Sequence, residues 1–530
     1  MQRIDGQLVM SPRDLIAELE CSHRLHLDWA VAVGKLDRPK RVVNPMLDLL
    51  AQIGRQHEED LSEPLESGGT FVQIENESHS LESYQRSFAE TQKAMSQGID
   101  VIAQATLFSG DFVGFVDFLI LSRDERNRPV KDSAGRFIYD PVDAKSARSA
   151  KEAAILQVTS YAYMLEQLGM PRPRYVYLWL AGDQEWSAST DEELGIAGES
   201  LIRTREKLNG FSDLPNPIWA PPTAGCSTCT WIEHCKSGRE DAQDLSLIYD
   251  IRMKARTAFI DVGIHTMHDL AFAADHQRPQ QMTPATFQKL RAQAHLQVRG
   301  LSSENILFEA INANHLSLMP EPSPGDVWFD IEGDPFAYDG EGLEYMLGVL
   351  SQSAGAPSEF VFKTFDARDR EEEGRSFTDF MQWIIARRRQ YPDMHIYHYA
   401  PYEKTALNKL ARIHGVMEKE VSKLLAEDVL VDLYSITRKS FRFSTPSMSI
   451  KYVEQVYQGK RVKGDGVVDA LGSVVEFELA LSALNAGDDM EFERRLQSIR
   501  EYNKVDCEST KELDMWLRDR AMELGINSWS

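Results

Sequence analysis

The chain has 530 residues, of which 42% are hydrophobic and 26% charged, and this composition is typical of globular proteins. At about 100–200 residues per domain, the length predicts about three domains. No run of about 18 apolar residues occurs, and the first residues lack an apolar leader, so we expect a cytoplasmic protein with no membrane partner. The net charge of −24 argues against a protein that coats nucleic acid nonspecifically, although a local basic groove could coexist with it.

The first 240 residues predict an α/β domain. Ser11-Pro12 supplies an N-cap and a first-turn proline for a helix over 11–34, and a second helix is expected over 46–62. The segments that follow have the order of an α/β core with a mixed sheet. Strands are expected over 101–108, 112–121, 137–144 and 174–180, and helices over 148–168 and 191–209.

Two proline-rich stretches, 215–222 and 320–324, delimit a middle part over 241–320 that we expect to be a helical connector. Residues 261–271, around Gly263, have a helix-hairpin-helix-like pattern. Such an element either binds nucleic acid or packs as an adaptor between domains.

A second α/β pattern fills residues 321–530. Strands are expected over 327–331, 345–351, 360–365 and 395–399, and helices over 370–389, 401–425 and 488–520.

The first domain carries residues suited to metal-dependent phosphodiester hydrolysis. Asp143 and Lys145 lie two apart on a predicted strand and therefore share a sheet face, and Asp117 ends the segment Gly114-Phe115-Val116-Asp117. Clustered carboxylates hold a cation that activates water, and a lysine stabilises developing negative charge. Other candidates are His57, which is either a ligand or a structural histidine, and the pair Gln157 and Tyr161, which share one helix face.

Four of the five cysteines form a split set, with Cys21 near the start and Cys226, Cys229 and Cys235 spaced as C-x2-C-x5-C. In a reducing compartment this spacing indicates metal ligands rather than disulfides. By spacing alone, four thiolates suit zinc and a 4Fe-4S cluster equally. Either group would close a loop of roughly 200 residues and so act as a staple. Cys507 is expected to be a buried free thiol.

The C-terminal part contains a second set of acidic residues. Asp330 and Glu332 share a sheet face, as a two-metal site requires, and Tyr502 and Asp506 stand one turn apart on a helix. Between them, His398 and Glu403 lie at a strand-to-helix turn.

The N-terminal series G-x2-H, G-x2-D, D-x-K and Q-x3-Y, flanked by the split cysteines, resembles the RecB-type branch of the PD-(D/E)xK nucleases, which have a restriction-endonuclease-like fold. It is most similar to the iron–sulfur members, such as AddB. The resemblance implies that His57, Asp117 and Asp143 bind Mg²⁺ or Mn²⁺, that Lys145 is catalytic, and that Gln157 and Tyr161 contact substrate. It also implies a 4Fe-4S cluster on Cys21, Cys226, Cys229 and Cys235.

The C-terminal series D-x-E, an N-x3-[FY]-D-like element and Y-x3-D resembles the DEDDy 3′-5′ exonucleases of the RNase H-like superfamily. The resemblance implies that Asp330, Glu332 and Asp506 hold two metal ions and that Tyr502 orients water. Two departures stand out: His398 replaces the usual asparagine, and Glu403 stands where an aspartate is expected. An inactive RNase H-like domain that only binds or scaffolds remains an alternative.

The whole chain thus resembles RecB-like nucleases that join both domains. This implies a metal-dependent DNA nuclease, an exonuclease on single-stranded or frayed DNA ends, that acts in DNA repair, recombination or defence. The alternatives are a catalytically degenerate nucleic-acid-binding adaptor for a helicase or recombination complex, and an RNA exonuclease. The chain has no G-x4-G-K-[ST] motif, so a helicase would be a separate partner.

Overall fold

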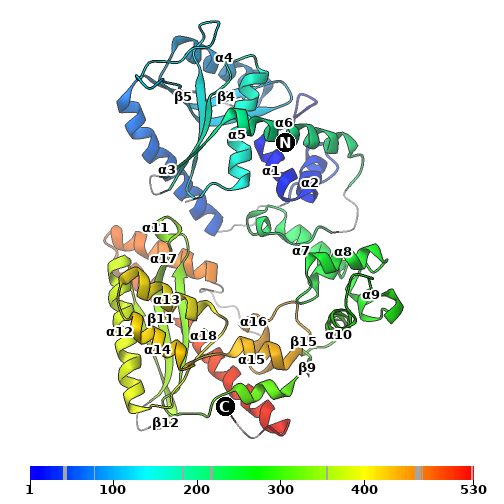
Figure 1. Cartoon of the computed structure of the whole chain (residues 1–530), viewed down its shortest axis with the longest axis vertical. Coiled ribbons are helices and arrows are strands. Elements are labelled where there is room, and N and C mark those ends of the chain that lie inside the picture. The colour runs from blue at the N-terminus through cyan, green and yellow to red at the C-terminus, as the bar shows by residue number, and fades with distance from the viewer. Residues whose placement is uncertain are drawn as a thin grey trace. The chain divides into compact units, whose positions relative to one another are not determined.

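The computed structural model describes every residue except 40–44, 77, 148, 182–183, 215–218, 354–355, 460–466, 468–469, 527–528 and 530. The chain divides into two compact units, Met1–Gly238 and Arg239–Ser530 (Figure 1). This division lies close to the boundary expected at residue 240. None of the described helices has the length and apolar character needed to cross a membrane.

The first unit is built on a six-stranded mixed sheet with the order β3-β4-β5-β6-β7-β8. The β3–β4 and β6–β7 pairs are parallel and the other pairs antiparallel. The four expected strands correspond to β4 to β7. The other two were not expected, because β3 is short and β8 is polar. The strands are β3 Phe71–Gln73, β4 Val101–Phe108, β5 Val113–Leu121, β6 Tyr139–Lys145, β7 Tyr175–Leu180 and β8 Gln184–Ser189.

Helices cover both faces of this sheet. On one face, α5 contacts β6 and β7. On the other, Leu61 and Leu65 of α3 pack against a buried cluster that includes Phe118 and Val142. A small hairpin, β1 Gln2–Ile4 and β2 Gln7–Val9, precedes the first helix, and the 3-10 turn η1 Ala224–Thr228 precedes the last. The helices are α1 Pro12–Glu20, α2 Ser22–Ala32, α3 Pro45–Gly68, α4 Leu81–Gln97, α5 Glu152–Gln167, α6 Thr190–Gly210 and α7 Ile232–Asp241.

The helix expected over 11–34 is two helices. Cys21 has an extended backbone, with φ −161° and ψ 94°, so it ends α1 and begins α2. At the start of α1 the backbone N–H of Ser11 donates to Asp14 Oδ2 at 2.8 Å, which is one half of a capping box. The break places the Cys21 side chain at a junction rather than on a continuous helix face.

The second unit begins with a helical segment that has a hydrophobic core of its own. Gly263, with φ +82°, allows the tight turn between α8 and α9, and Thr266 caps α9. Strand β9 Phe308–Ala310 pairs with β15 Phe441–Phe443 and so joins this segment to the rest of the unit. The segment contains η2 Leu245–Leu247, α8 Met253–Asp261, α9 Met267–Ala271, η3 Asp275–Gln277, α10 Pro284–Gly300 and η4 Ala313–Leu318.

The main sheet of the second unit has five strands in the order β12-β11-β10-β13-β14. β10, β13 and β14 run parallel, β11 pairs antiparallel with β10, and β12 pairs antiparallel with β11. The strands are β10 Val327–Asp334, β11 Leu343–Ser353, β12 Ala356–Asp366, β13 Ile396–His398 and β14 Leu430–Asp432. The helices are α11 Ala337–Gly340, α12 Arg370–Gln390, α13 Tyr402–His414, α14 Glu418–Ala426, α15 Leu433–Ser440, α16 Ile450–Val453, α17 Ala470–Asn485 and α18 Asp489–Glu523, with the 3-10 turn η5 Glu454–Val456.

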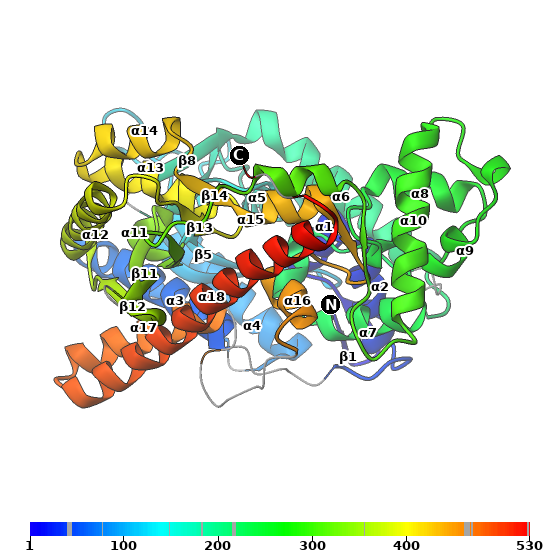
Figure 2. The same ribbon diagram turned by 90° about the horizontal axis from the view of Figure 1, so that it is seen from below.

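The alternation of side chains along β10 decides where its carboxylates point. Phe329 and Ile331 join a core cluster with helices α12 to α14, whereas Trp328 joins the cluster of α18 on the opposite face. Asp330 and Glu332 lie two and four residues after Trp328, so they share its sheet face. They therefore face the long helix α18, which packs along β10 and β11 (Figure 2).

Two differences from the expected helices concern this unit. The helix expected over 401–425 is divided into α13 and α14, because Gly415 ends α13 in the left-handed conformation at φ +63°. Helices α11, α15, α16 and α17 were not expected, and α17 packs against α18.

Candidate active sites

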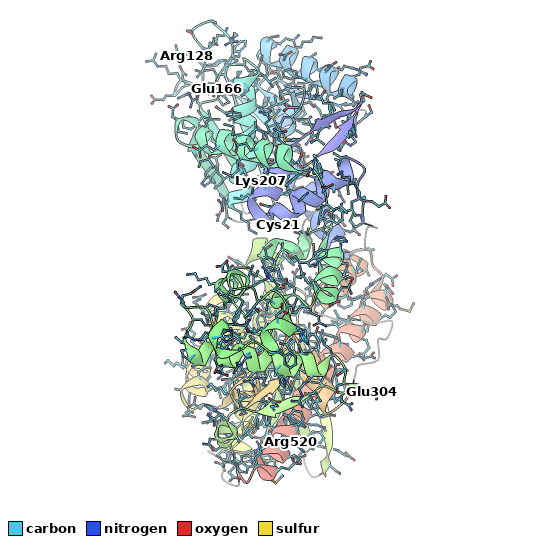
Figure 3. All side chains as sticks on the ribbon, turned by 90° about the vertical axis from the view of Figure 1, so that its right-hand side faces the viewer. Cys21, Arg128, Glu166, Lys207, Glu304 and Arg520 are labelled. Carbon is cyan, nitrogen blue, oxygen red and sulfur yellow. The ribbon has the colours of Figure 1, made fainter. Side chains whose placement is uncertain are left out.

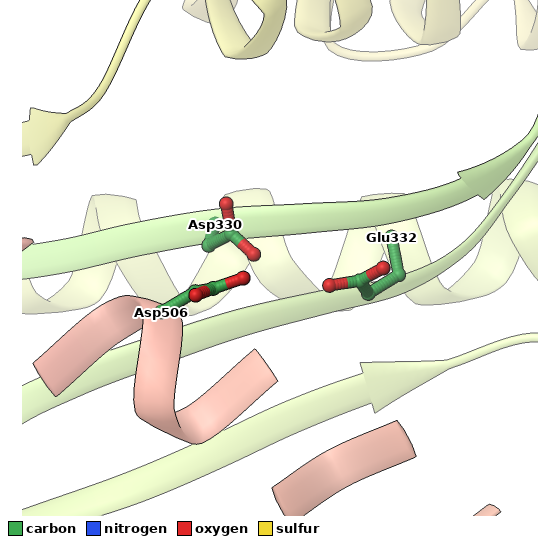
Figure 4. Close-up of side chains that lie close together, drawn as sticks. All are labelled: Asp330, Glu332 and Asp506. Carbon is green, nitrogen blue, oxygen red and sulfur yellow. The ribbon is translucent and has the colours of Figure 1, made fainter. Parts of the chain in front are cut away.

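The second unit holds a tight acidic trio. Asp330 and Glu332 from β10 and Asp506 from α18 each offer a carboxylate oxygen within 4.8 Å of the other two (Figure 4). Glu332 and Asp506 are buried and Asp330 is half-buried. Three carboxylates this close repel one another unless a proton or a cation lies between them, which makes the trio suited to a divalent cation.

The electrostatics of Glu332 reflect this crowding. Burial, and then the negative charge of Asp506, raise the pKa of Glu332 to about 8. Hydrogen bonds from Ser473 of α17 and Asn503 of α18, and the positive charge of Lys451, oppose the rise. A bound divalent cation would reverse the balance and hold the carboxylate ionised.

Tyr502 and Lys451 lie beside the trio. Burial and the nearby Asp506 raise the pKa of the Tyr502 hydroxyl, so that this group keeps its proton at neutral pH and serves as a hydrogen-bond donor. The Lys451 ammonium lies 5.1 Å from the centre of the Tyr502 ring, which is a cation–π distance. Lys451 was not among the expected site residues, because α16 is distant in sequence from both motifs.

Glu403, the expected fourth acidic residue, is not part of the tight trio. It is buried and its Oε2 lies 3.2 Å from Nδ1 of the fully buried His398. His398 Nδ1 is also 2.7 Å from the carbonyl oxygen of Ala400, a residue with a strained φ of +82°. The Asp432 carboxylate accepts hydrogen bonds from the backbone N–H groups of Ala400 and Ser435, which gives it a structural role at the start of α15.

In the first unit, five of the expected residues come together at β5, β6 and α5. The Lys145 ammonium lies 2.5 Å from Asp143 Oδ2, and Gln157 donates to Asp143 Oδ1 at 3.1 Å. Gln157 Nε2 also lies 2.9 Å from the Tyr161 hydroxyl. Asp117 Oδ2 accepts a hydrogen bond from the backbone N–H of Ala144, at 2.8 Å.

Asp143 is fully buried. Burial and the charge of Asp117 raise its pKa to about 8, while Lys145 opposes the rise. This arrangement is typical of carboxylates that share a cation. Among the described residues, however, Asp117, Asp143 and His57 do not form a group as tight as the trio of the second unit.

His57 and its neighbour Glu58 occupy different surroundings. His57 Nε2 lies 3.4 Å from the carbonyl oxygen of Trp179. The Glu58 carboxylate accepts a hydrogen bond from Gln104, and burial and the charge of Asp117 raise its pKa, with Lys145 opposing. Glu58 therefore faces the acidic pair and was missed, although its position directly after the G-x2-H motif was a usable signal.

Gln104 is held in a strained backbone conformation. It lies within β4, where left-handed residues are rare, yet its φ is +50°. Its neighbours Ala103 and Ala105 pair with Phe118 and Val116 of β5, so Gln104 stands opposite Asp117. Strain at such a place is typical of functional sites.

A cavity of about 910 Å³ adjoins these residues. Its lining includes Glu58, Asp117, Gln157 and Tyr161, together with three arginines and the cysteine segment. The arginines are Arg13, Arg24 and Arg38, and the cysteine segment contributes Cys229 and Trp231. Arginines beside carboxylates suit a phosphate backbone that approaches a metal site.

The four expected cluster cysteines come from the two ends of the first unit. Lys207 of α6 donates to Ser22 at 2.7 Å, next to Cys21 (Figure 3), and Trp231 donates to Asp28 of α2 at 2.7 Å. These bonds join α2 to α6 and to the late cysteine segment. Burial, and to a lesser extent the neighbouring thiols of Cys226 and Cys21, raise the pKa of Cys229, so these three thiols are close enough to interact.

The thiol geometry bears on the group that the cysteines would hold. Four thiolates at about 2.3 Å from one tetrahedral zinc ion would lie about 3.8 Å apart. No three of these sulfur atoms, all of which belong to described residues, lie within 4.8 Å of one another. The four thiols are half-buried.

Comparison with known proteins finds a family match within the second unit. Residues 327–518 match the family model of the RNase_H superfamily. No curated protein matches the chain. The match covers β10 to α18, so it contains the whole acidic trio, and it confirms the expected RNase H-like part. An RNase H-like domain with such a trio indicates a nuclease that uses divalent metal, with nucleic acid as substrate.

Proposed function

We propose that the chain is a divalent-metal-dependent DNA nuclease whose second unit removes nucleotides from 3′ ends. The acidic trio of Asp330, Glu332 and Asp506, inside the RNase_H superfamily match, carries this proposal. Mg²⁺ or Mn²⁺ bound there would activate water and neutralise charge on the scissile phosphate.

The residues around the trio have distinct parts in this proposal. The three carboxylates hold the cations, and Asp330, the most exposed of them, faces the substrate side. Tyr502 keeps its proton, and its hydroxyl group, which is hydrogen-bonded to Asp506, orients the attacking water. Lys451 provides positive charge near the phosphate. Glu403, paired with His398, acts from outside the trio.

The test uses the full chain and single-stranded DNA labelled at either end, with Mg²⁺ or Mn²⁺. Asp506→Asn should reduce release of the 3′-terminal nucleotide by about a thousandfold, because a metal ligand supports several kcal/mol of transition-state stabilisation. Asp514→Asn is a matched control, since Asp514 is a buried aspartate two turns later on α18 that bonds Trp328 and Arg518. Equal activity of both variants would contradict the proposal.

We further propose that the first unit is an iron–sulfur PD-(D/E)xK nuclease domain. Asp117 and Asp143 would hold the cation with His57 or Glu58, Lys145 would assist the attack of water, and Gln157 and Tyr161 would contact substrate. The ion pair between the buried Asp143 and the half-buried Lys145 supports this assignment. Cys21, Cys226, Cys229 and Cys235 would hold a 4Fe-4S cluster that staples α2 to the late cysteine segment.

Two measurements test this second part. Anaerobically purified protein should be brown, with about four iron and four sulfide per chain; a colourless protein with stoichiometric zinc would contradict the cluster. In an Asp506→Asn background, Asp143→Asn should remove the cleavage that remains, whereas Asp140→Asn should not. Asp140 lies on the same strand and bonds the backbone of Arg174 and Tyr175 instead.

The substrate and pathway follow from the resemblance rather than from the site geometry. We propose single-stranded or frayed DNA ends as substrate, a role in repair, recombination or defence, and a separate helicase as a partner. Comparison of DNA and RNA of one sequence tests the alternative of an RNA exonuclease. The position of Glu403 outside the trio favours the other alternative, a degenerate adaptor, and binding of DNA without cleavage by either unit would support that function.

A further inference from the structure

We infer that Asn503 is a positioning residue that fixes Asp330 and Glu332 for cation binding, and that Gly348 is a glycine because the Asn503 amide occupies its side-chain space. This inference rests on the proposed metal-dependent activity of the second unit. It assigns a role to a residue that lies between Tyr502 and Asp506 but belongs to neither end of that motif.

The contacts of Asn503 run from α18 to both carboxylates of β10. Its Nδ2 donates a hydrogen bond to Asp330 Oδ2 at 2.8 Å, and Glu332 Oε1 lies at 3.5 Å from the same atom. The Asn503 side chain is fully buried. One amide group therefore contacts both acidic residues, which are neighbours on one face of β10.

The opposite side of the amide fixes its orientation. The Cys507 thiol lies 3.8 Å from Asn503 Oδ1, at a distance suited to a weak S–H donor. A Cβ atom at Gly348 would lie only 1.7 Å from Oδ1, so β11 approaches the amide as closely as a backbone can. The thiol also lies 3.5 Å from the carbonyl oxygen of Gly348. Because carboxylate oxygens accept hydrogen bonds, the NH₂ group of Asn503 faces Asp330, and Oδ1 faces the thiol.

The chemistry of a neutral amide suits this place. An amide donates hydrogen bonds to two carboxylates without adding positive charge, whereas a lysine or arginine would neutralise the trio and compete with the cation. The hydrogen bond from Asn503 to Asp330 Oδ2 fixes the orientation of that carboxylate beside Glu332. Groups that orient metal ligands in this way commonly change metal affinity by about 10–100-fold when they are removed.

The experiment measures metal binding and cleavage separately. The full chain carries Asp143→Asn, which silences the first unit, and is compared with the same chain bearing Asn503→Leu, Asn503→Ala or Gly348→Ala. Free Mn²⁺ is titrated by electron paramagnetic resonance, and the Mg²⁺ concentration that gives half-maximal 3′-end cleavage is measured. Both concentrations should rise about 10–100-fold, and excess metal should restore most of the maximal rate.

Ser509→Ala is the control for general destabilisation. Ser509 is fully buried on the same helix but donates to Glu454 Oε2 at 2.7 Å, away from the trio. It should lower the unfolding midpoint and leave Mn²⁺ affinity unchanged. If both Asn503 variants fail to fold, Gly348→Ala decides, because it keeps the amide and displaces it.

The outcomes separate this inference from the proposed function. If Asp506→Asn abolishes Mn²⁺ binding and cleavage while the folded Asn503 and Gly348 variants bind Mn²⁺ as tightly as their parent, the positioning role is wrong. If Asp506→Asn itself changes neither measurement, the proposed nuclease function is wrong.

Discussion

At the scale of single residues, short-range spacing predicted the acidic pairs and long-range packing decided their surroundings. Asp330 and Glu332 share a sheet face because side chains alternate along a strand, so their proximity could be read from the sequence. The strained Gln104 could not, because its role depends on a strand partner, Asp117, that only the fold supplies. Asn503 lies inside the Y-x3-D motif, but its proposed role in positioning the carboxylates becomes apparent only from its contact with Gly348.

At the same scale, Asp514 should make the free energy of unfolding depend on pH. It is buried on α18 and accepts hydrogen bonds from Arg518 and Trp328. Burial raises its pKa from 3.8 to about 6. Between pH 4 and 6 the folded state thus binds more protons at Asp514 than the unfolded state, so its contribution to the free energy of unfolding falls as the pH rises through this range and is constant above it.

Asp514→Asn should remove this dependence. The free energy of unfolding of the variant relative to the natural protein should increase between pH 4 and 6, by on the order of 3 kcal/mol. Any loss of the ion pair with Arg518 adds a nearly constant offset. Urea denaturation at pH 4.5, 5.5 and 7 measures the difference, and a difference that stays constant with pH would contradict the burial effect.

At the scale of helices and strands, periodicity located most elements and failed at their interruptions. The strands β4 to β7 and β10 to β13 were expected near their observed positions. The breaks at Cys21 and Gly415 were not, because the apolar pattern continues across both. The polar strand β8 lacks the β-rich composition on which the expectation relied, and β3 has only three residues.

Two glycines inside helices should respond oppositely to alanine. Gly195 of α6 has open space where a Cβ would lie, so Gly195→Ala should stabilise the first unit by about 1 kcal/mol through helix propensity. At Gly238 of α7 a Cβ would lie 1.9 Å from the Trp219 ring. Gly238→Ala should therefore destabilise the unit by about 1 kcal/mol or more, because the overpacking costs more than the gain in helix propensity.

The Gly238 site also borders the cysteine segment. Trp219 packs between His23 and His234, which are neighbours of Cys21 and Cys235 in sequence. Thermal unfolding monitored together with visible absorbance should show that Gly238→Ala loses the proposed iron–sulfur cluster at a lower temperature than Gly195→Ala. Stabilisation by both substitutions would contradict the packing at Trp219.

At the scale of the whole molecule, the described hydrophobic clusters each belong to one unit. The segment expected as a separate connector shares a core with the RNase H-like part. Its Phe308 and Leu316 pack into the same cluster as Trp328 and Leu513 of that part. The boundary expected at residue 320 therefore divides a shared core, and length and proline content could not reveal this.

A cut after Asp241, where α7 ends, should leave two fragments that fold independently. Residues 242–530 should unfold cooperatively and keep the proposed cleavage that depends on Asp506, and residues 1–241 should keep the proposed iron–sulfur cluster. Circular dichroism and the end-labelled DNA assay measure both properties. A cut after residue 320 should instead give insoluble fragments, since it divides the core around Trp328.

The contact between Gly348 and Asn503 also constrains how this protein can evolve. A lineage that acquires a side chain at position 348 must displace or lose the amide at position 503, because both groups cannot occupy one space. The two positions, 155 residues apart in the chain, should therefore covary among descendants. Those that have exchanged the pair should have given up metal-dependent cleavage or found another donor for the carboxylate at position 330.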